Sequence, residues 1–170
     1  MSDALSSNKV TKTRVIVSYC NAHSRRQFYD LEKLYPEEIG WLLDTYGKIW
    51  ENETIIKDKK LSDEKRLAYH QEHSLPAMTS IREWAVKKME SDDFEEYSAL
   101  GKAVKYFHKY YDGLMMFCVV LGAPIDNNRM EEKLKIVIRG RKTAHFYKTV
   151  NSAGVANVII SLIATAAQAD

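Results

Sequence analysis

The stretch that decides the fold is Ser98–Leu121, SALGKAVKYFHKYYDGLMMFCVVL, which has the strongest helical pattern in the chain. Its apolar residues recur alternately four and three positions apart, and this spacing places them on one face of a helix. They are Leu100, Val104, Phe107, Tyr111, Leu114, Cys118 and Leu121. Such a stripe is typical of a core helix, and Gly122 and Pro124 are expected to end it.

Residues 22–121 as a whole are predicted to form a helical region. Pro36 suits the first turn of a helix that runs to about Glu53, because its fixed backbone angle is helical and its missing N–H is not needed there. Ser62 is expected to cap the next helix, and Pro76 to interrupt it. The sequence therefore predicts a mainly α fold.

One or two short strands are expected outside this region. Residues 1–12 are small and polar, which is typical of a flexible start. The β-branched run within Thr13–Tyr19 predicts a strand at about 13–20. A second short strand is expected at His145–Tyr147.

Residues 125–168 are predicted to contain a short helix, a basic loop and a final helix. Asn128 opens the short helix, which reaches about Ile138, and Ser152 is expected to cap the final one. The final helix is predicted to be a buried core helix with one polar seam, because most of its residues are apolar. Its core-facing residues include Val155, Val158, Ile159, Leu162 and Ile163.

The composition indicates a single domain spanning residues 1–170, since 45% of the 170 residues are hydrophobic. The net charge of +2 does not by itself indicate a nucleic-acid or membrane partner. No apolar run approaches the roughly 20 residues that span a bilayer, so no membrane contact is expected. Cys20 and Cys118 are expected to be free thiols in a cytoplasmic protein.

Glu131 has two interpretations. Asn128 and Glu131 stand three residues apart, as in a helix start where each side chain covers the other's exposed amide. The run Ile125-Asp126-Asn127-Asn128-Arg129-Met130-Glu131, however, resembles the segment that carries the catalytic glutamate in the insertion sequence sixty-six family of DDE-type transposases. In that family an Asp-Asn-Asn triplet precedes the glutamate.

Further blocks resemble the same family, in the family's order. Cys20-Asn21-Ala22-His23-Ser24-Arg25-Arg26-Gln27-Phe28 looks like its Cys-x-Ala-His-x-Arg-Arg-x-Phe block. Three more are Leu100-Gly101-Lys102-Ala103, Gly140-Arg141-Lys142 and Ser161-Leu162-Ile163-Ala164-Thr165-Ala166. Five ordered blocks across nearly the whole chain make a chance similarity improbable.

This resemblance implies the carboxy-terminal part of a ribonuclease-H-like α/β catalytic domain with a helical insertion. The family's chemistry implies two aspartates and one glutamate that hold two Mg²⁺ ions, because cleavage of DNA builds negative charge on oxygens. By resemblance, Asp3 and Glu131 are the catalytic residues and metal ligands present here. The family's first aspartate lies upstream, so the chain is expected to be a truncated transposase that is inactive alone.

Two features speak against full activity. Asp3 has few matching neighbours, and the alternative is a solvated residue of the flexible start. Glu132 stands where the family usually has an arginine, and the two adjacent acids repel each other.

A basic run is the candidate DNA interface. It contains no acid from its first member to its last, and such a run suits DNA phosphates, although an ordinary solvated surface is the alternative. Its members are Lys133, Lys135, Arg139, Arg141, Lys142 and Lys148. Arg25 and Arg26 form a smaller candidate pair, which could instead bridge acids of neighbouring helices.

The sequence allows other interpretations. Cys20 and His23 have a zinc-like spacing but lack a second pair, and His70 and His73 are expected on a solvated face. The main hypothesis is a truncated enzyme of DNA transposition with DNA ends as partner. The alternative is a helical module that binds DNA, intact transposase or a missing upstream half without catalysis. A decayed gene product is a third possibility.

Overall fold

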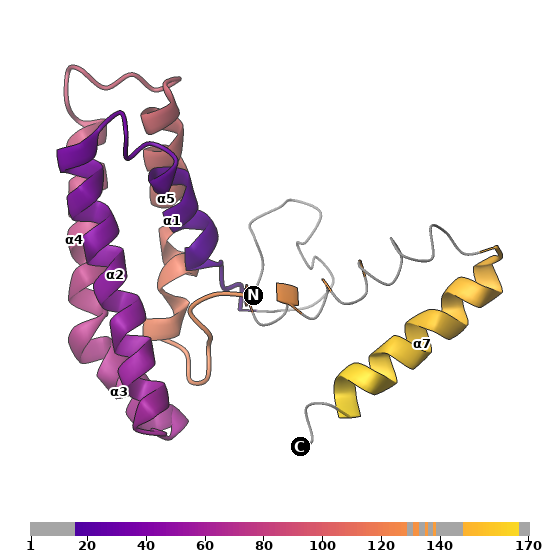
Figure 1. Cartoon of the computed structure of the whole chain (residues 1–170). Helices are drawn as coiled ribbons and strands as arrows, with labels where there is room; N and C mark the ends of the chain where they lie inside the picture. The colour runs from indigo at the N-terminus through magenta and orange to yellow at the C-terminus, as the bar shows by residue number, and fades with distance from the viewer. Residues whose placement is uncertain (1–15, 129–130, 133–134, 136–137, 139–147, 167–170) are drawn as a thin grey trace. The chain divides into compact units, whose positions relative to one another are not determined.

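The structure is a computed structural model that describes residues 16–128, 131–132, 135, 138 and 148–166 (Figure 1). By its contacts the chain divides into two compact units, Met1–Asn127 and Asn128–Asp170, where one domain was expected. Each unit is described by itself. Asp3, the expected flexible start at 1–12 and the expected strand at His145–Tyr147 lie outside the described residues.

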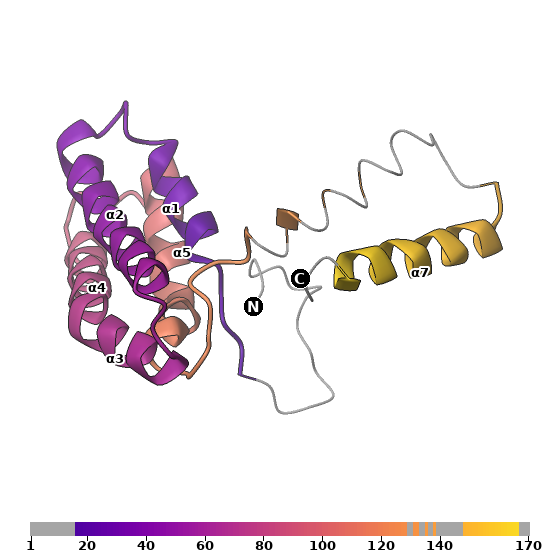
Figure 2. The same cartoon turned by 60° about the horizontal axis from the view of Figure 1, so that its bottom comes forward.

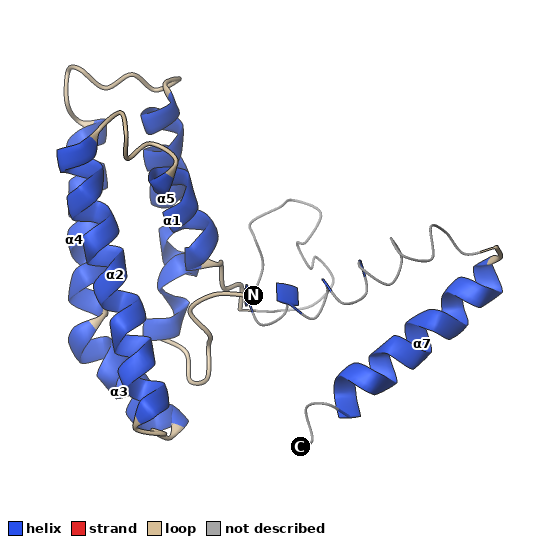
Figure 3. Ribbon diagram, viewed as in Figure 1, coloured by secondary structure: helices blue, strands red, loops and turns tan. Residues whose placement is uncertain are grey.

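The first unit is a bundle of helices. They are α1 (Asn21–Tyr29), α2 (Pro36–Asp58), α3 (Asp63–His73), α4 (Leu75–Met89), α5 (Ala99–Leu114) and the 3₁₀ helix η2 (Met115–Cys118). α5 packs against α1 and α4, and α2 packs against α1, α3 and α4, as Figure 1 and Figure 2 show. The described residues are thus mainly α, and Figure 3 shows no strand among them.

The helix starts follow from local chemistry, as predicted. Pro36 is the first residue of α2, whose end at Asp58 lies beyond the expected end near Glu53. The Ser62 hydroxyl caps α3 by accepting from the Lys65 amide at 3.5 Å, and the Ser98 hydroxyl caps α5 by accepting from the Gly101 amide at 2.9 Å.

The central stripe lies in the core, but the helix that carries it is shorter than predicted. All of the expected stripe residues up to Cys118 are buried, whereas Leu121 is 52% exposed. The α-helix ends at Leu114 and continues as η2. The 3₁₀ helix ends at Cys118, and Leu121 lies in the turn that follows, so it no longer belongs to the helical face on which the stripe was calculated.

The strand expected at 13–20 is not formed over its described part. Residues 16–20 contain only a single bridge at Tyr19, whose amide donates to the Gly113 carbonyl at 2.9 Å. Residues 13–15 lie outside the described part of the chain. Within that part no neighbouring strand is present to pair with Ile16 and Val17, whose side chains are exposed.

In the second unit, Asn128, Glu131, Glu132, Lys135 and Ile138 are helical, in agreement with the short helix predicted there. The final helix is α7 (Val150–Ala166). Its cap is Thr149 rather than Ser152: the Thr149 hydroxyl accepts from the Ser152 amide, and the Ser152 hydroxyl accepts from the Thr149 amide, both at 3.1 Å.

Within the second unit taken by itself, α7 is not buried as predicted. The side chains predicted to face the core are half exposed or more, with exposed fractions from 50% at Ile159 to 64% at Leu162; the others are Val155, Val158 and Ile163. Periodicity shows which side chains share a face, but it does not show that the chain supplies a partner for that face. None of the described helices is long and apolar enough to cross a membrane.

Candidate functional site

The segment that leads to Glu131 is held to the first unit by side chains from α2 and α3. Arg66 of α3 donates from Nη1 to the Ala123 carbonyl at 2.8 Å. Trp50 of α2 donates from Nε1 to Oδ2 of Asp126 at 3.3 Å. These bonds tie Ala123–Asn127 to the bundle immediately before the helical residues of the second unit begin.

The start of α1 holds the same segment. The backbone amide and the side-chain Nδ2 of Asn21 both donate to the Ile125 carbonyl, at 3.2 and 3.1 Å. Nδ2 also donates to the Leu114 carbonyl at 2.8 Å, so Asn21 joins the end of α5 to this segment. Asn21 is only 1% exposed, and loss of these buried bonds would leave carbonyl groups without donors.

Cys20 also contacts the segment Ala123–Asn127. The Asn127 amide donates to its sulfur at 3.5 Å. Burial raises the pKa of the Cys20 thiol above its usual value and outweighs the backbone hydrogen bonds that lower it, so the thiol stays protonated. Cys20 and Cys118 are both free and buried, as predicted.

Two of the sequence blocks therefore meet in space. Cys20 and Asn21 open the Cys-x-Ala-His block, and Asp126 and Asn127 belong to the Asp-Asn-Asn triplet. More than one hundred positions separate the two blocks in sequence, yet they form one set of contacts. Sequence reasoning identified both blocks but did not predict that one holds the other.

The carboxylates expected to hold metal are only partly described. Glu131 is helical and half-buried, Glu132 beside it is exposed, and Asp3 lies outside the described residues. Among the described residues, no group of three or more His, Cys, Asp or Glu side chains could hold a metal ion. The described residues alone therefore do not form a magnesium or zinc centre.

The basic run is described at two of its six positions. Lys135 is helical and exposed, and Lys148 is exposed in the turn before α7. The other four, Lys133, Arg139, Arg141 and Lys142, lie outside the described residues.

The two arginines of the smaller pair lie in different surroundings. Arg26 is exposed on α1, whereas Arg25 is half-buried, with its guanidinium 5.7 Å from the centre of the Tyr29 ring. Arg25 lines a groove of about 580 Å³ between α1 and α2 that the acids Glu32, Asp44 and Glu51 also line. Those acids repel a phosphate. Arg25 is therefore less suited to phosphate contact than the residues of the basic run, which has no acid in its sequence.

A buried polar network was missed from the sequence. Oε2 of Glu53 accepts from Nε and Nη2 of Arg66, at 3.3 and 3.1 Å, and from Nε2 of His70 at 3.0 Å. Nδ1 of His70 is hydrogen-bonded to the Ser74 hydroxyl at 2.9 Å. His70 is fully buried, so the expectation that it lies on a solvated face is wrong.

The charges in this network control the ionisation of Glu53. Burial alone would raise the pKa of its carboxyl, but the hydrogen bond from His70 and the charges of Arg66 and Lys57 lower it below its usual value. Because Arg66 also bonds to Ala123, the network and the segment before Glu131 share a side chain. The sequence does contain a signal for the buried position of Glu53, because this acid lies on the apolar face of α2, between the buried Ile49 and Ile56.

Comparisons with known proteins agree with the family that the sequence resembles. A family model described as the transposase IS66 family matches residues 1–154. Among curated proteins, the uncharacterized protein y4jD of Sinorhizobium fredii (strain NBRC 101917 / NGR234) is 29% identical over 152 residues, which cover 88% of the chain and 29% of y4jD. The uncharacterized protein y4hP of the same strain is 27% identical over 164 residues, which cover 89% of the chain and 29% of y4hP.

The chain thus spans less than a third of the length of these curated relatives. No solved structure gives a significant match.

Proposed function

The chain belongs to the IS66 family of transposases, and from this premise we propose that it is part of the machinery that cleaves and joins DNA in transposition, and that it is inactive alone. The observation that carries the proposal is the family match over residues 1–154, which includes both Asp3 and Glu131. The proposed catalytic domain is ribonuclease-H-like, and this chain contributes the glutamate and a helical region to it.

The contacts around Asp126 support this proposal. Two blocks that resemble the family, Cys20-Asn21 and Asp126-Asn127, meet at the attachment of the segment before Glu131. An interaction of this kind gives the blocks a shared task, which is to hold Ala123–Asn127, the segment that precedes the glutamate in sequence. Residues that position a reacting group need such support, because small displacements slow a reaction strongly.

Asp3 and Glu131 are the proposed ligands of a divalent ion, expected to be Mg²⁺. Carboxylate oxygens are hard ligands and suit this ion. A bound ion of this kind stabilises negative charge on the attacking and leaving oxygens of a phosphodiester. The role of this chain's own residues is to bring the two carboxylates together and to hold DNA beside them.

DNA is the proposed partner, through the basic run from Lys133 to Lys148 and through Arg25 and Arg26. Each phosphate that a lysine or arginine neutralises releases counterions, so the affinity for DNA must fall as the salt concentration rises.

Replacing Arg139, Arg141 and Lys142 together by alanine is expected to weaken duplex DNA binding and to reduce its salt dependence. The loss of three phosphate contacts would make the slope of log affinity against log salt shallower by about 2.7, at about 0.9 per contact. Fluorescence anisotropy with a labelled duplex, repeated at salt concentrations from roughly 50 to 200 mM, measures the affinity and its salt dependence.

The matched control replaces three exposed lysines of the first unit, Lys33, Lys65 and Lys87, and so changes the net charge equally. This control is expected to retain most of the affinity and slope. Wild-type binding that is weak and unchanged by the Arg139, Arg141 and Lys142 variant would remove DNA binding by the basic run from the proposal.

A further inference from the structure

We propose that a groove on the outer side of α5 binds single-stranded DNA. The groove has a volume of about 460 Å³, and its lining comes from α5, the end of α4 and the segment that joins them. The proposal rests on DNA being the partner in the proposed function. It adds a second contact surface, which lies entirely within the first unit and contains no residue of the basic run.

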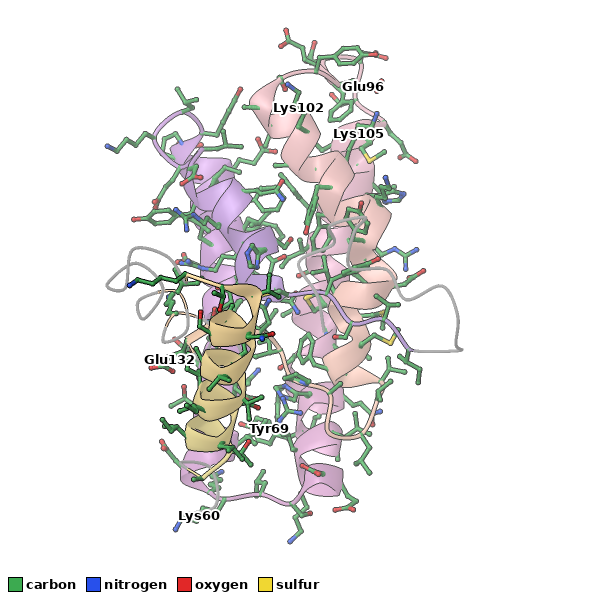
Figure 4. The ribbon with its side chains drawn as sticks, turned by 90° about the vertical axis from the view of Figure 1, so that its right-hand side faces the viewer. Lys60, Tyr69, Glu96, Lys102, Lys105 and Glu132 are labelled. Carbon is green, nitrogen blue, oxygen red and sulfur yellow. The ribbon has the colours of Figure 1, made fainter. Side chains whose placement is uncertain are left out.

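Three lysines form a row along this groove. Lys102, Lys105 and Lys109 are spaced three and four positions apart on α5, so they lie on the same side of the helix, and all three are exposed. Figure 4 shows Lys102 and Lys105 close together at the end of the bundle where α5 begins. A row of exposed ammonium groups is suited to successive phosphates of a nucleic-acid strand.

Tyrosines supply the apolar part of the same groove. Tyr97 is 82% exposed, and Tyr106 and Tyr110 are half-buried with their ring centres 4.8 Å apart. The ring of Tyr110 also contacts Tyr19, at 4.9 Å between centres, which holds it in place. Aromatic rings beside cationic side chains are the features on which unpaired bases stack.

The described acids near the groove leave two of the lysines without an ion pair, one of which, Lys109, has its ammonium 5.2 Å from the centre of the Tyr110 ring. Glu96 lines the groove and forms an ion pair with Lys105, as Figure 4 shows. Within the described residues, neither Lys102 nor Lys109 forms an ion pair. Two phosphate contacts are therefore expected rather than three.

The aromatic lining favours a single strand over a duplex. In a duplex the base faces are stacked on one another, so only the backbone could reach the groove and the tyrosine rings would gain nothing. In a single strand the bases are free to stack on Tyr97 and its neighbours while the phosphates meet the lysines.

The test compares a labelled oligothymidine with a duplex of the same length by fluorescence anisotropy, using the whole chain. The double variant Lys102→Glu with Lys109→Glu is expected to bind the single strand at least about 10-fold more weakly, with a salt slope shallower by about 1.4, at about 0.7 per contact. Tyr97→Ala should weaken it by about 5-fold or more, because one stacking contact is lost.

The control double variant Lys33→Glu with Lys87→Glu carries the same charge change on exposed lysines outside the groove and should retain the single-strand affinity. Circular dichroism confirms that each variant is folded. Single-strand binding that survives both groove variants overturns the proposal, as does an equal loss for single strand and duplex.

These outcomes are distinguishable from a failure of the proposed function. If the basic-run variant loses duplex binding while the groove variants keep single-strand binding, only the groove proposal fails. If the chain binds neither single-stranded nor duplex DNA, the groove proposal and the proposed function both fail.

Discussion

Replacing Glu53 by alanine is expected to lower the free energy of unfolding by about 3–5 kcal/mol, because one partner of a buried ion pair is removed and the others stay behind. Arg66 and His70 would lose their shared acceptor, and both are largely shielded from water. Urea denaturation followed by helical circular dichroism measures the change. Glu51→Ala is the matched control, since Glu51 is exposed on the same helix, and its effect should stay within about 0.5 kcal/mol.

The same variant should change the response to acid. The folded-state pKa of Glu53 is lowered, so its contribution to stability is present above the unfolded pKa of about 4.3 and is lost as the pH falls through the folded value. The wild type should therefore lose stability on acidification more steeply than Glu53→Ala. An alanine variant within about 1 kcal/mol of the wild type at neutral pH would show that the network contributes little.

Replacing Gly101 by alanine is expected to destabilise the first unit by about 3 kcal/mol, at the upper end of the usual cost of overpacking. An added Cβ would lie 2.1 Å from the Glu95 carbonyl oxygen and 2.8 Å from that of Glu96. Both are backbone atoms before α5, so neither can move aside without shifting the chain. This close approach gives a physical reason for the glycine in the Leu-Gly-Lys-Ala block.

Gly47→Ala is the matched comparison and should have the opposite sign. An added Cβ at this position, in the middle of α2, meets nothing within 4 Å. Alanine there should stabilise the protein by about 0.5–1 kcal/mol, because glycine loses more backbone freedom on folding. Thermal or urea unfolding of the two variants side by side tests this; equal effects would contradict the steric explanation.

The beginnings of the helices were predictable from the sequence because they depend on local chemistry. Pro36, Ser62 and Ser98 act within one turn of their own positions. The helix ends were less predictable, because they depend on packing against other elements. After Leu114, for example, α5 continues as the 3₁₀ helix η2, which packs against α3 and α4. The exposure of α7 was not predictable, because an apolar pattern does not reveal whether a partner surface is present.

The candidate site was predictable only in part. Resemblance identified the blocks around Cys20 and Asp126, but their contact depends on tertiary structure across more than one hundred positions. The spacing of His70 from His73 by itself predicts a solvated face, because it carries no information about the other helices. Its actual partner, Glu53, lies on a different helix, and the informative signal was an acid on an apolar face.

The central claim is that Glu131 is a metal-binding carboxylate, and a titration with Mn²⁺ followed by electron paramagnetic resonance tests it most directly. The free ion gives a signal that disappears on binding, and Mn²⁺ accepts the same oxygen ligands as Mg²⁺. The wild-type chain should bind the ion only weakly, because Asp3 and Glu131 are two of the three carboxylates expected in the family's site. Glu131→Gln should bind it at least about 10-fold more weakly still, and Glu132→Gln should bind like the wild type. A wild-type chain that binds no Mn²⁺, or a Glu131→Gln chain that binds it as tightly as the wild type, would contradict the claim.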